Sequence, residues 1–334
     1  MNYIKMSPMA GLSGYGGGAT GLGFVGGAGG TGKWYGSRGC FTGGYNGSSD
    51  LDEIGYVTIS STGNATDFGN LTQSRQYASS VSDGSRGVCM GGGNAGGAPF
   101  AVTDYITIGS AGNATDFGDP SNNRAGGAGV ADGLYAIMAG GYNQDNSWPA
   151  NGTNVMDYYT ISTPGNATDF GDTLAAMQIP GGVNDATRGV ILGGNGNSDN
   201  RLETIQYITM ATTGNSTDFG DLTNPTAYCA GGVDNSVRGI IHSGTEDGVG
   251  ATNKMEYITI QTTGDATDFG DATQARFSAG GCGNQTRGIW GGGKIPAGSP
   301  TDTIDYVTID TTGNATDFGN MQQSKQGMSA CSGT

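Results

Sequence analysis

The chain of 334 residues contains 67 glycines, only 13% charged residues and a net charge of −15. A strongly acidic protein lacks the basic surface that phosphate backbones and anionic lipid headgroups attract, so neither nucleic-acid binding nor membrane insertion is expected. No run of about 18 apolar residues is present, which argues against a membrane-spanning helix.

Residues 1–32 form a glycine-rich segment whose single charge is Lys5. It lacks the apolar stretch of a secretory signal, so synthesis in a cytoplasm is expected. Such a segment cannot pack a core of its own, but it can order on a partner by burying a few apolar anchors. We therefore predict an attachment arm, and the alternatives are a disordered tail or a segment folded back on the first repeat. The predicted anchors are Tyr3, Ile4, Met6, Met9 and Leu12.

Six copies of one phrase follow, a glycine and a polar turn leading into Thr-Asp-Phe-Gly. Their phenylalanines are separated by 49, 53, 49, 50 and 49 residues. A fixed period near 50 is typical of a repeat architecture. Residues that recur in every copy are expected to be scaffold, so functional residues should be those that break the pattern. The six phenylalanines are Phe68, Phe117, Phe170, Phe219, Phe269 and Phe318.

One repeat, from Ala275 to Met321, predicts four antiparallel strands, A to D. Strand A is expected within Ala275–Cys282, B within Arg287–Gly293, C over Ile304–Ile309 and D over Thr316–Asn320. Strand C is rich in β-branched and aromatic residues, and glycine or asparagine turns separate the runs. A helix is disfavoured because glycine interrupts every run. Four such strands make one blade of a β-propeller.

Counting strands predicts how the ring closes. Strands B, C and D occur six times, whereas strand A has seven candidates, and the last one ends the chain. Closure by a terminal strand removes an open sheet edge. We therefore predict an all-β, six-bladed propeller over residues 33–334, with Gln326–Cys331 innermost in blade 1. The alternative keeps Phe24-Val25 in blade 1. The candidates for strand A are Gly23–Gly26, Gln76–Ser79, Ala125–Ala128, Ala176–Ile179, Ala227–Ala230, Phe277–Gly280 and Gly327–Ala330.

The repeats resemble the kelch repeat: a strand ending in Gly-Gly, a tyrosine-containing strand, then an aromatic residue on a short outer strand. A basic residue ahead of strand A fits the same pattern. Phenylalanine stands where kelch repeats usually carry tryptophan, and the third repeat has Asp132-Gly133 where strand B should begin with Arg-Gly. The resemblance implies a kelch-like, six-bladed β-propeller. The basic residues ahead of strand A are Arg75, Arg124, Arg276 and Lys325.

The loops between strands B and C are long and differ in every repeat, as binding surfaces on a rigid frame usually do. Four aromatic residues in these loops could stack on sugar rings or anchor a protein partner. The alternative is that they only cover their own loops. These residues are Tyr45, Phe100, Tyr142 and Trp148.

Catalytic and metal chemistry are poorly supported. The repeated aspartates (Asp67 and its equivalents) lack the spacing of a calcium loop, so turn stabilisation is favoured. The asparagines of the phrase (Asn64 and its equivalents) form N-x-Ser/Thr acceptor sequences for N-glycosylation. Because Asp265 stands at the same place in the fifth copy, stabilisation of an Asx turn is the favoured role. The single histidine, His242, lies in a strand interior, where a packed or channel-lining role is expected. We therefore expect neither an enzyme nor a cofactor or metal site. The five cysteines are expected to be buried fillers.

The phrasing of the repeats also resembles structural proteins of marine tailed bacteriophages. This resemblance implies a virion component made in the host cytoplasm: a capsid decoration, a tail appendage such as a tail fiber, or a host-attachment module. The arm would contact other virion proteins, and the B–C loops a host-surface glycan or protein. The alternatives are a bacterial surface carbohydrate-binding adhesin, which should carry a secretion signal, and a propeller hydrolase or lyase, which should show a convergent ionisable cluster.

Overall fold

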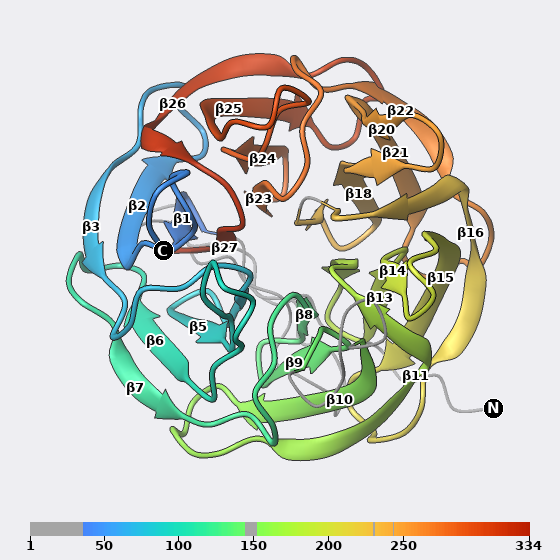
Figure 1. Ribbon diagram of the computed structural model, residues 1–334, viewed down its shortest axis with the longest axis horizontal. Helices are drawn as coiled ribbons and strands as arrows, with labels where there is room; N and C mark the ends of the chain where they lie inside the picture. The colour runs from blue at the N-terminus through green and yellow to red at the C-terminus, as the bar shows by residue number, and fades with distance from the viewer. Residues whose placement is uncertain (1–35, 144–151, 230, 243) are drawn as a thin grey trace, which may run out of the picture.

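The computed structural model describes residues 36–143, 152–229, 231–242 and 244–334. Six antiparallel sheets form a ring around a central axis, so the protein is a six-bladed β-propeller (Figure 1). Each blade has four principal strands, A to D from the axis to the rim. No helix in the described ranges is long and apolar enough to cross a membrane.

The first three blades follow the chain from its described start. Blade 1 consists of β27 (Ser329–Gly333), β1 (Arg38–Thr42), β2 (Glu53–Thr58) and β3 (Thr66–Asn70). Blade 2 consists of β4 (Ser79–Ser82), β5 (Arg86–Met90), β6 (Thr103–Thr107) and β7 (Thr115–Gly118). Blade 3 consists of β8 (Ala128–Ala131), β9 (Tyr135–Ala139), β10 (Thr153–Thr160) and β11 (Thr168–Gln178), joined by the loop strand β14 (Asn195–Gly196).

The other three blades complete the ring. Blade 4 consists of β12 (Gly181–Asn184), β13 (Arg188–Leu192), β15 (Leu202–Thr209) and β16 (Thr217–Ala227), joined by the loop strands β19 (Thr245–Glu246) and β20 (Gly250–Ala251). Blade 5 consists of β17 (Val233–Asp234), β18 (Arg238–His242), β21 (Lys254–Thr259) and β22 (Thr267–Asp271). Blade 6 consists of β23 (Gly280–Gly283), β24 (Arg287–Gly291), β25 (Thr301–Thr308) and β26 (Thr316–Lys325).

The C-terminal strand closes the ring, as predicted. β27 pairs antiparallel with β1 from Arg38 opposite Gly333 to Thr42 opposite Ser329. It therefore takes the innermost position in blade 1, which the alternative gave to Phe24-Val25, two residues outside the described ranges. Pairing the last strand with the first blade leaves β1 without a free edge.

Strand A begins between two and six residues later than the sequence suggested. The expected segments contain one residue per blade with φ between 51° and 64°, in the left-handed region. A strand cannot run through that conformation, so the chain turns there and enters strand A afterwards. These six residues, called the axial ring below, are Tyr77, Gly126, Ile179, Tyr228, Ser278 and Gly327.

Arginines at the start of strand B join neighbouring blades. In five blades the guanidinium lies 4.1–4.5 Å from the centroid of the strand C tyrosine and donates a bond of 2.7–3.0 Å to a carbonyl of the next blade. In blade 3, Tyr135 replaces the arginine and packs edge-on against Tyr158 at 5.2 Å. The alignment of Asp132-Gly133 with the Arg-Gly that begins strand B in the other repeats was therefore wrong. Asp132 belongs to the A–B turn, where it accepts bonds from the N–H groups of Leu134 and Tyr135.

The repeated phrase is a clasp between blades and not a self-contained turn. At five junctions its asparagine, and at the sixth Asp265, accepts a backbone N–H bond of 3.0–3.1 Å from the end of strand D of the preceding blade or the residue after it. The expected Asx-turn role is corrected accordingly. The last glycine of the phrase is also explained: at Gly118 a Cβ would lie 2.4 Å from the carbonyl oxygen of Gly165 in the next blade. Only glycine permits that approach.

Candidate functional site

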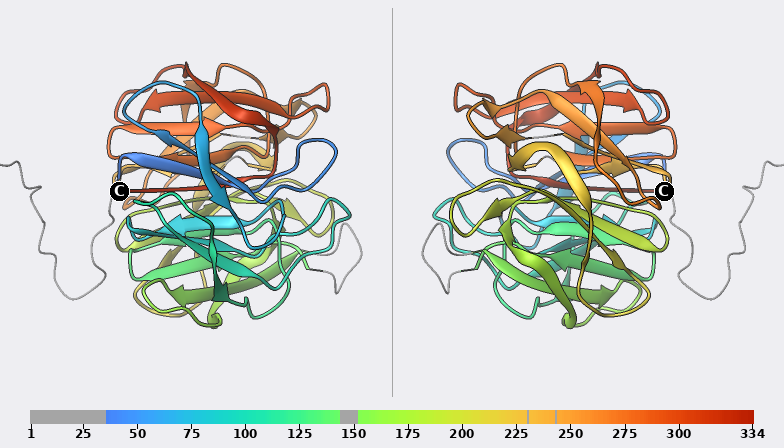
Figure 2. Two further views of the ribbon diagram at one scale, coloured as in Figure 1. Left: turned by 90° about the vertical axis from the view of Figure 1, so that its left-hand side faces the viewer. Right: turned by 90° about the vertical axis from the view of Figure 1, so that its right-hand side faces the viewer.

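The two faces of the ring differ in what they carry. Antiparallel order places the A–B and C–D turns on one face and the B–C and D–A connections on the other. The described chain begins at Gly36 beside β1 and ends at Thr334. The backbone N–H of Thr334 donates a hydrogen bond to the carbonyl oxygen of Gly84, in the A–B turn of blade 2. In Figure 2 the marked C-terminus accordingly lies on the face opposite the projecting loops. The chain ends and the variable loops thus occupy opposite faces.

The B–C loops together form a crown, and bonds between described residues join three pairs of neighbouring loops. The Asp50 carboxylate accepts a 2.9 Å bond from Ala95 N–H, which links blades 1 and 2. Gly152 N–H donates to the side-chain oxygen of Asn197 at 2.8 Å, and Arg201 pairs with Asp247 at 2.6 Å. These bonds hold loops of different sequence in fixed relative positions, which reduces the entropy lost when a partner binds. The described residues of the crown are 43–52, 91–102, 140–143, 152, 193–201, 244–253 and 292–300.

Three of the four predicted contact residues lie on this face. Tyr45, Phe100 and Tyr142 are half-buried at the bases of the loops of blades 1, 2 and 3, and Trp148 lies outside the described residues. They do not form one cluster. Tyr142 lies at the axis, because a Cβ on Gly126 would be 3.3 Å from its ring. Tyr45 pairs through its backbone with Gln326 and Asp50.

The axial ring surrounds the opening of the central channel on the crown face. Neighbouring members of the axial ring are joined by five hydrogen bonds of 2.6–3.1 Å, in which the backbone N–H of one residue donates to the carbonyl oxygen of the equivalent residue in the adjacent blade. For example, Gly126 donates to Tyr77, and Tyr77 donates to Gly327. The ring joins the blades at the axis as the clasps join them at the rim.

Four members of the axial ring are not glycine, although all six have left-handed backbones. Gly126 and Gly327 adopt this conformation without steric cost, whereas Tyr77, Ile179 and Tyr228 do not. A left-handed bulky residue costs about 1–3 kcal/mol. Since glycine suffices at the same position in two blades, these side chains are retained against a conformational penalty. Strain of this kind indicates a site.

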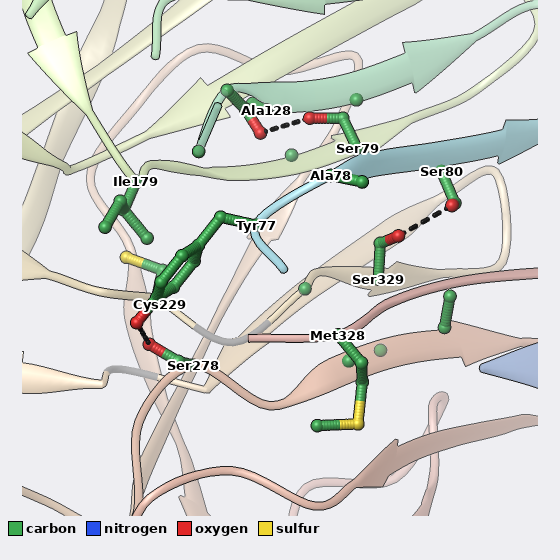
Figure 3. A pocket seen from close by; sticks show the side chains of 18 of the residues that line it. Tyr77, Ala78, Ser79, Ser80, Ala128, Ile179, Cys229, Ser278, Met328 and Ser329 are labelled. Atoms are coloured by element: carbon green, nitrogen blue, oxygen red, sulfur yellow. Dashed lines mark hydrogen bonds between the residues drawn. The ribbon is translucent and has the colours of Figure 1, made fainter. Parts of the chain in front are cut away.

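The mouth of the channel is aromatic. Tyr77 lines it, and the Tyr142 ring lies beside Gly126 of the axial ring. Tyr228 belongs to the axial ring, and its ring meets the Phe277 ring edge-on at 5.9 Å. Tyr77 points across the axis, its hydroxyl 3.5 Å from that of Ser278 (Figure 3). Burial raises the pKa of Tyr228 to about 12, with smaller contributions from Tyr77 and Asp199. Burial, followed by Tyr77, Tyr228 and Asp50, also raises the pKa of Tyr142. Burial likewise raises the pKa of Tyr77, so all three hydroxyls are neutral at physiological pH.

A cavity of about 100 Å³ lies beneath the mouth, and a second of about 80 Å³ lies toward the other face. Small-molecule sites usually enclose about 300–1,000 Å³. The upper cavity can accept one side chain or a few waters. Between the two cavities small residues form the waist of the channel, and a Cβ on Gly232 would lie 2.2 Å from Gly182 O. The waist consists of Ser80, Gly129, Gly182, Gly232, Gly281 and Ala330.

Ionisable groups are distributed as packing requires. In the described parts of the chain, no group of three or more His, Cys, Asp or Glu side chains could hold a metal ion. His242 is fully buried and packs against Trp290, with ring centroids 6.4 Å apart, so its predicted packing role is confirmed. The five cysteines are free and buried, also as predicted.

Sequence reasoning missed Tyr77, Tyr228 and Phe277 because they were assigned to strand A. A usable signal was present, since this position varies among tyrosine, glycine, isoleucine and serine in an otherwise regular repeat. The fold and the mouth define a β-propeller with one preorganised, variable face. Comparisons with protein-family models and with curated proteins gave no match for this chain.

Proposed function

We propose that this chain is a non-enzymatic, kelch-type propeller of a bacteriophage particle, attached through residues 1–32 and binding a partner with the crown. The observation that carries the proposal is the polarity of the ring: the described chain begins and ends on one face, and the variable loops lie on the other. An anchor at the N-terminus would direct the crown away from the particle. The kelch-like order of the strands and the phage-like phrasing of the repeats support the class.

The non-enzymatic part rests on where the repeated polar groups are used. The asparagines of the repeated phrase bond neighbouring blades, and the three arginines ahead of strand A pair with buried aspartates, as Lys325 pairs with the half-buried Glu53. The small volume of the axial cavities favours recognition of a surface group over enclosure of a substrate. A bacterial surface adhesin would bind glycans with the same face. A phage particle protein and an adhesin are therefore distinguished by whether the protein is found in particles or on the cell surface.

Particle association is tested directly. Purified particles should contain the full chain by mass spectrometry, and removal of Met1–Gly30 should leave the propeller folded but abolish incorporation. A second variant, Tyr45→Ala with Phe100→Ala, serves as the matched control, because it should incorporate normally and reduce adsorption to host cells. Incorporation of the truncated chain at wild-type occupancy would move the attachment site to the propeller, and absence from particles would refute the virion assignment.

A further inference from the structure

We propose that the axial mouth binds one basic side chain, arginine or lysine, of a protein partner. This inference rests on the proposed binding role of the crown and names the chemistry that the centre of the crown would recognise. Its geometric basis is a cluster of aromatic side chains at the axis: Tyr77 lines the cavity, Tyr142 lies beside Gly126, and Tyr228 packs edge-on against Phe277.

The aromatic surface is the first argument. Cations bind to the faces of tyrosine and phenylalanine rings, and arginine also stacks on them. Tyr77, Ile179 and Tyr228 keep side chains at positions where the backbone favours glycine. The same fold at Gly126 and Gly327 shows that the side chains are not needed to form the ring. A ligand that contacts them gives a reason for their retention.

Unsatisfied acceptors at the mouth are the second argument. Gln76 is buried, and its side-chain oxygen has no hydrogen-bond partner within the described ranges. This oxygen lies at the axial ring, 3.1 Å from where a Cβ on Gly327 would be. One carboxylate oxygen of Asp50, in the B–C loop of blade 1, is likewise buried and unpartnered among these residues. Guanidinium and ammonium groups carry donors and no acceptor, so they match the Gln76 oxygen at the axial ring.

Charge and size agree with a basic side chain. Asp50 and Asp199 act on the electrostatic environment of Tyr142 and Tyr228, and the whole chain carries a net charge of −15. Two cations of the protein lie nearby: Arg201 is paired with Asp247, and the Lys294 ammonium lies over the Phe277 ring, 5.9 Å from its centroid, which leaves the three tyrosines for a partner's side chain. The cavity of about 100 Å³ admits the end of one long side chain. Arginine is also among the residues that most often dominate binding energy at interfaces.

The test uses the full chain with its tyrosine rings isotopically labelled for NMR. The probe is N-acetyl-arginine amide, and the matched neutral probe is N-acetyl-citrulline amide, which has nearly the same shape without the charge. We expect the arginine probe to shift the signals of Tyr77, Tyr142 and Tyr228, with an affinity at least about tenfold above that of the citrulline probe.

The variants separate binding from folding. Tyr77→Gly with Tyr228→Gly should remain folded, because relief of the left-handed strain offsets part of the ring packing that is lost, and should abolish the shifts at Tyr142. Gln76→Met removes the unpartnered acceptor and should weaken binding several-fold. Equal binding of both probes, or no binding up to their solubility limit, would overturn the proposal. Shifts caused by N-acetylglucosamine alone would also overturn it and would indicate a glycan site. The particle experiment above is independent of all these outcomes.

Discussion

Asp265 in blade 5 accepts a 3.0 Å hydrogen bond from the backbone N–H of Asp221 in blade 4, where the other blades use asparagine. Asparagine and aspartate share only the acceptor oxygen, so the acceptor is what the junction requires. The bond spans two blades 44 residues apart in sequence. One short phrase, repeated six times, thus specifies the contacts that hold the rim together.

The clasp gives a first prediction. Asp265→Asn should leave the free energy of unfolding within about 0.5 kcal/mol of wild type, because the acceptor is kept. Asp265→Leu should lower it by about 1 kcal/mol, since the exposed N–H of Asp221 then bonds only to water. Urea denaturation measures both, and equal losses for the two variants would contradict the role of the acceptor.

The buried ion pairs give a second prediction. Arg124 lies 2.7 Å from Asp157, and both side chains are fully buried. Blade 4 has Met177 and Gln206 at the same positions, with the Gln206 amide 3.8 Å from the methionine sulfur. Arg124→Met alone should cost about 3–5 kcal/mol, because it leaves a buried carboxylate unpaired.

Adding Asp157→Gln to that variant should recover most of the loss, because the double variant reproduces the neutral pair of blade 4. A thermodynamic cycle over the two single variants and the double variant measures the coupling. If the double variant were less stable than Arg124→Met, the blades would not be interchangeable at this site.

Ring closure gives a third prediction. Deleting Ser329–Thr334 removes β27 and exposes the inner edge of β1, so the melting temperature should fall and the protein should aggregate. Deleting Thr334 alone is the control, since it lies beyond the strand. Calorimetry and size-exclusion chromatography report the two effects. A six-residue truncation as stable as the full chain would contradict closure by this strand.

His242 gives a fourth prediction, on pH. Burial, aided by nearby Arg276, lowers the pKa of His242 to about 3 from an ordinary value of 6.5. The unfolded chain therefore binds a proton below pH 6.5 while the folded chain does not, and stability falls as pH decreases from 6.5 toward 3, by up to about 1.4 kcal/mol per pH unit.

His242→Leu should remove this component, because Leu192 fills the equivalent position of blade 4. The difference in unfolding free energy between the variant and wild type should grow in favour of the variant from pH 7 to pH 4. A constant difference over that range would show that the imidazole titrates normally.

The thiols give a fifth prediction. Burial raises the pKa of Cys40 and of Cys229 to about 12, so neither is a thiolate at neutral pH. All five cysteines should resist a thiol-specific chromophoric reagent in the native protein and react once guanidinium unfolds it. Rapid reaction of one thiol without denaturant would reveal local opening.

The period, the strand types and the closure were predictable from the sequence, because each depends on local pattern or on counting. Strand composition and glycine turns define strand C within a few residues and also the start of strand D. In the last repeat strand D runs to Lys325 and not to Asn320, and in blades 3 and 4 it continues into the segment predicted as strand A. A seventh strand A at the end of the chain can pair only with the open inner edge of blade 1, so the way the ring closes was predictable without tertiary information.

The tertiary structure decided what depends on contacts between blades. Asn166 accepts a hydrogen bond from the backbone N–H of Asp119 in the preceding blade. Arg124 pairs with Asp157, which is 33 positions away in the sequence. The left-handed turn at Tyr77 was not predictable, because its conformation is imposed by hydrogen bonds to neighbouring blades and opposes the preference of tyrosine. The sequence therefore determined the blades and their number, while packing around the axis decided which side chains meet at the mouth.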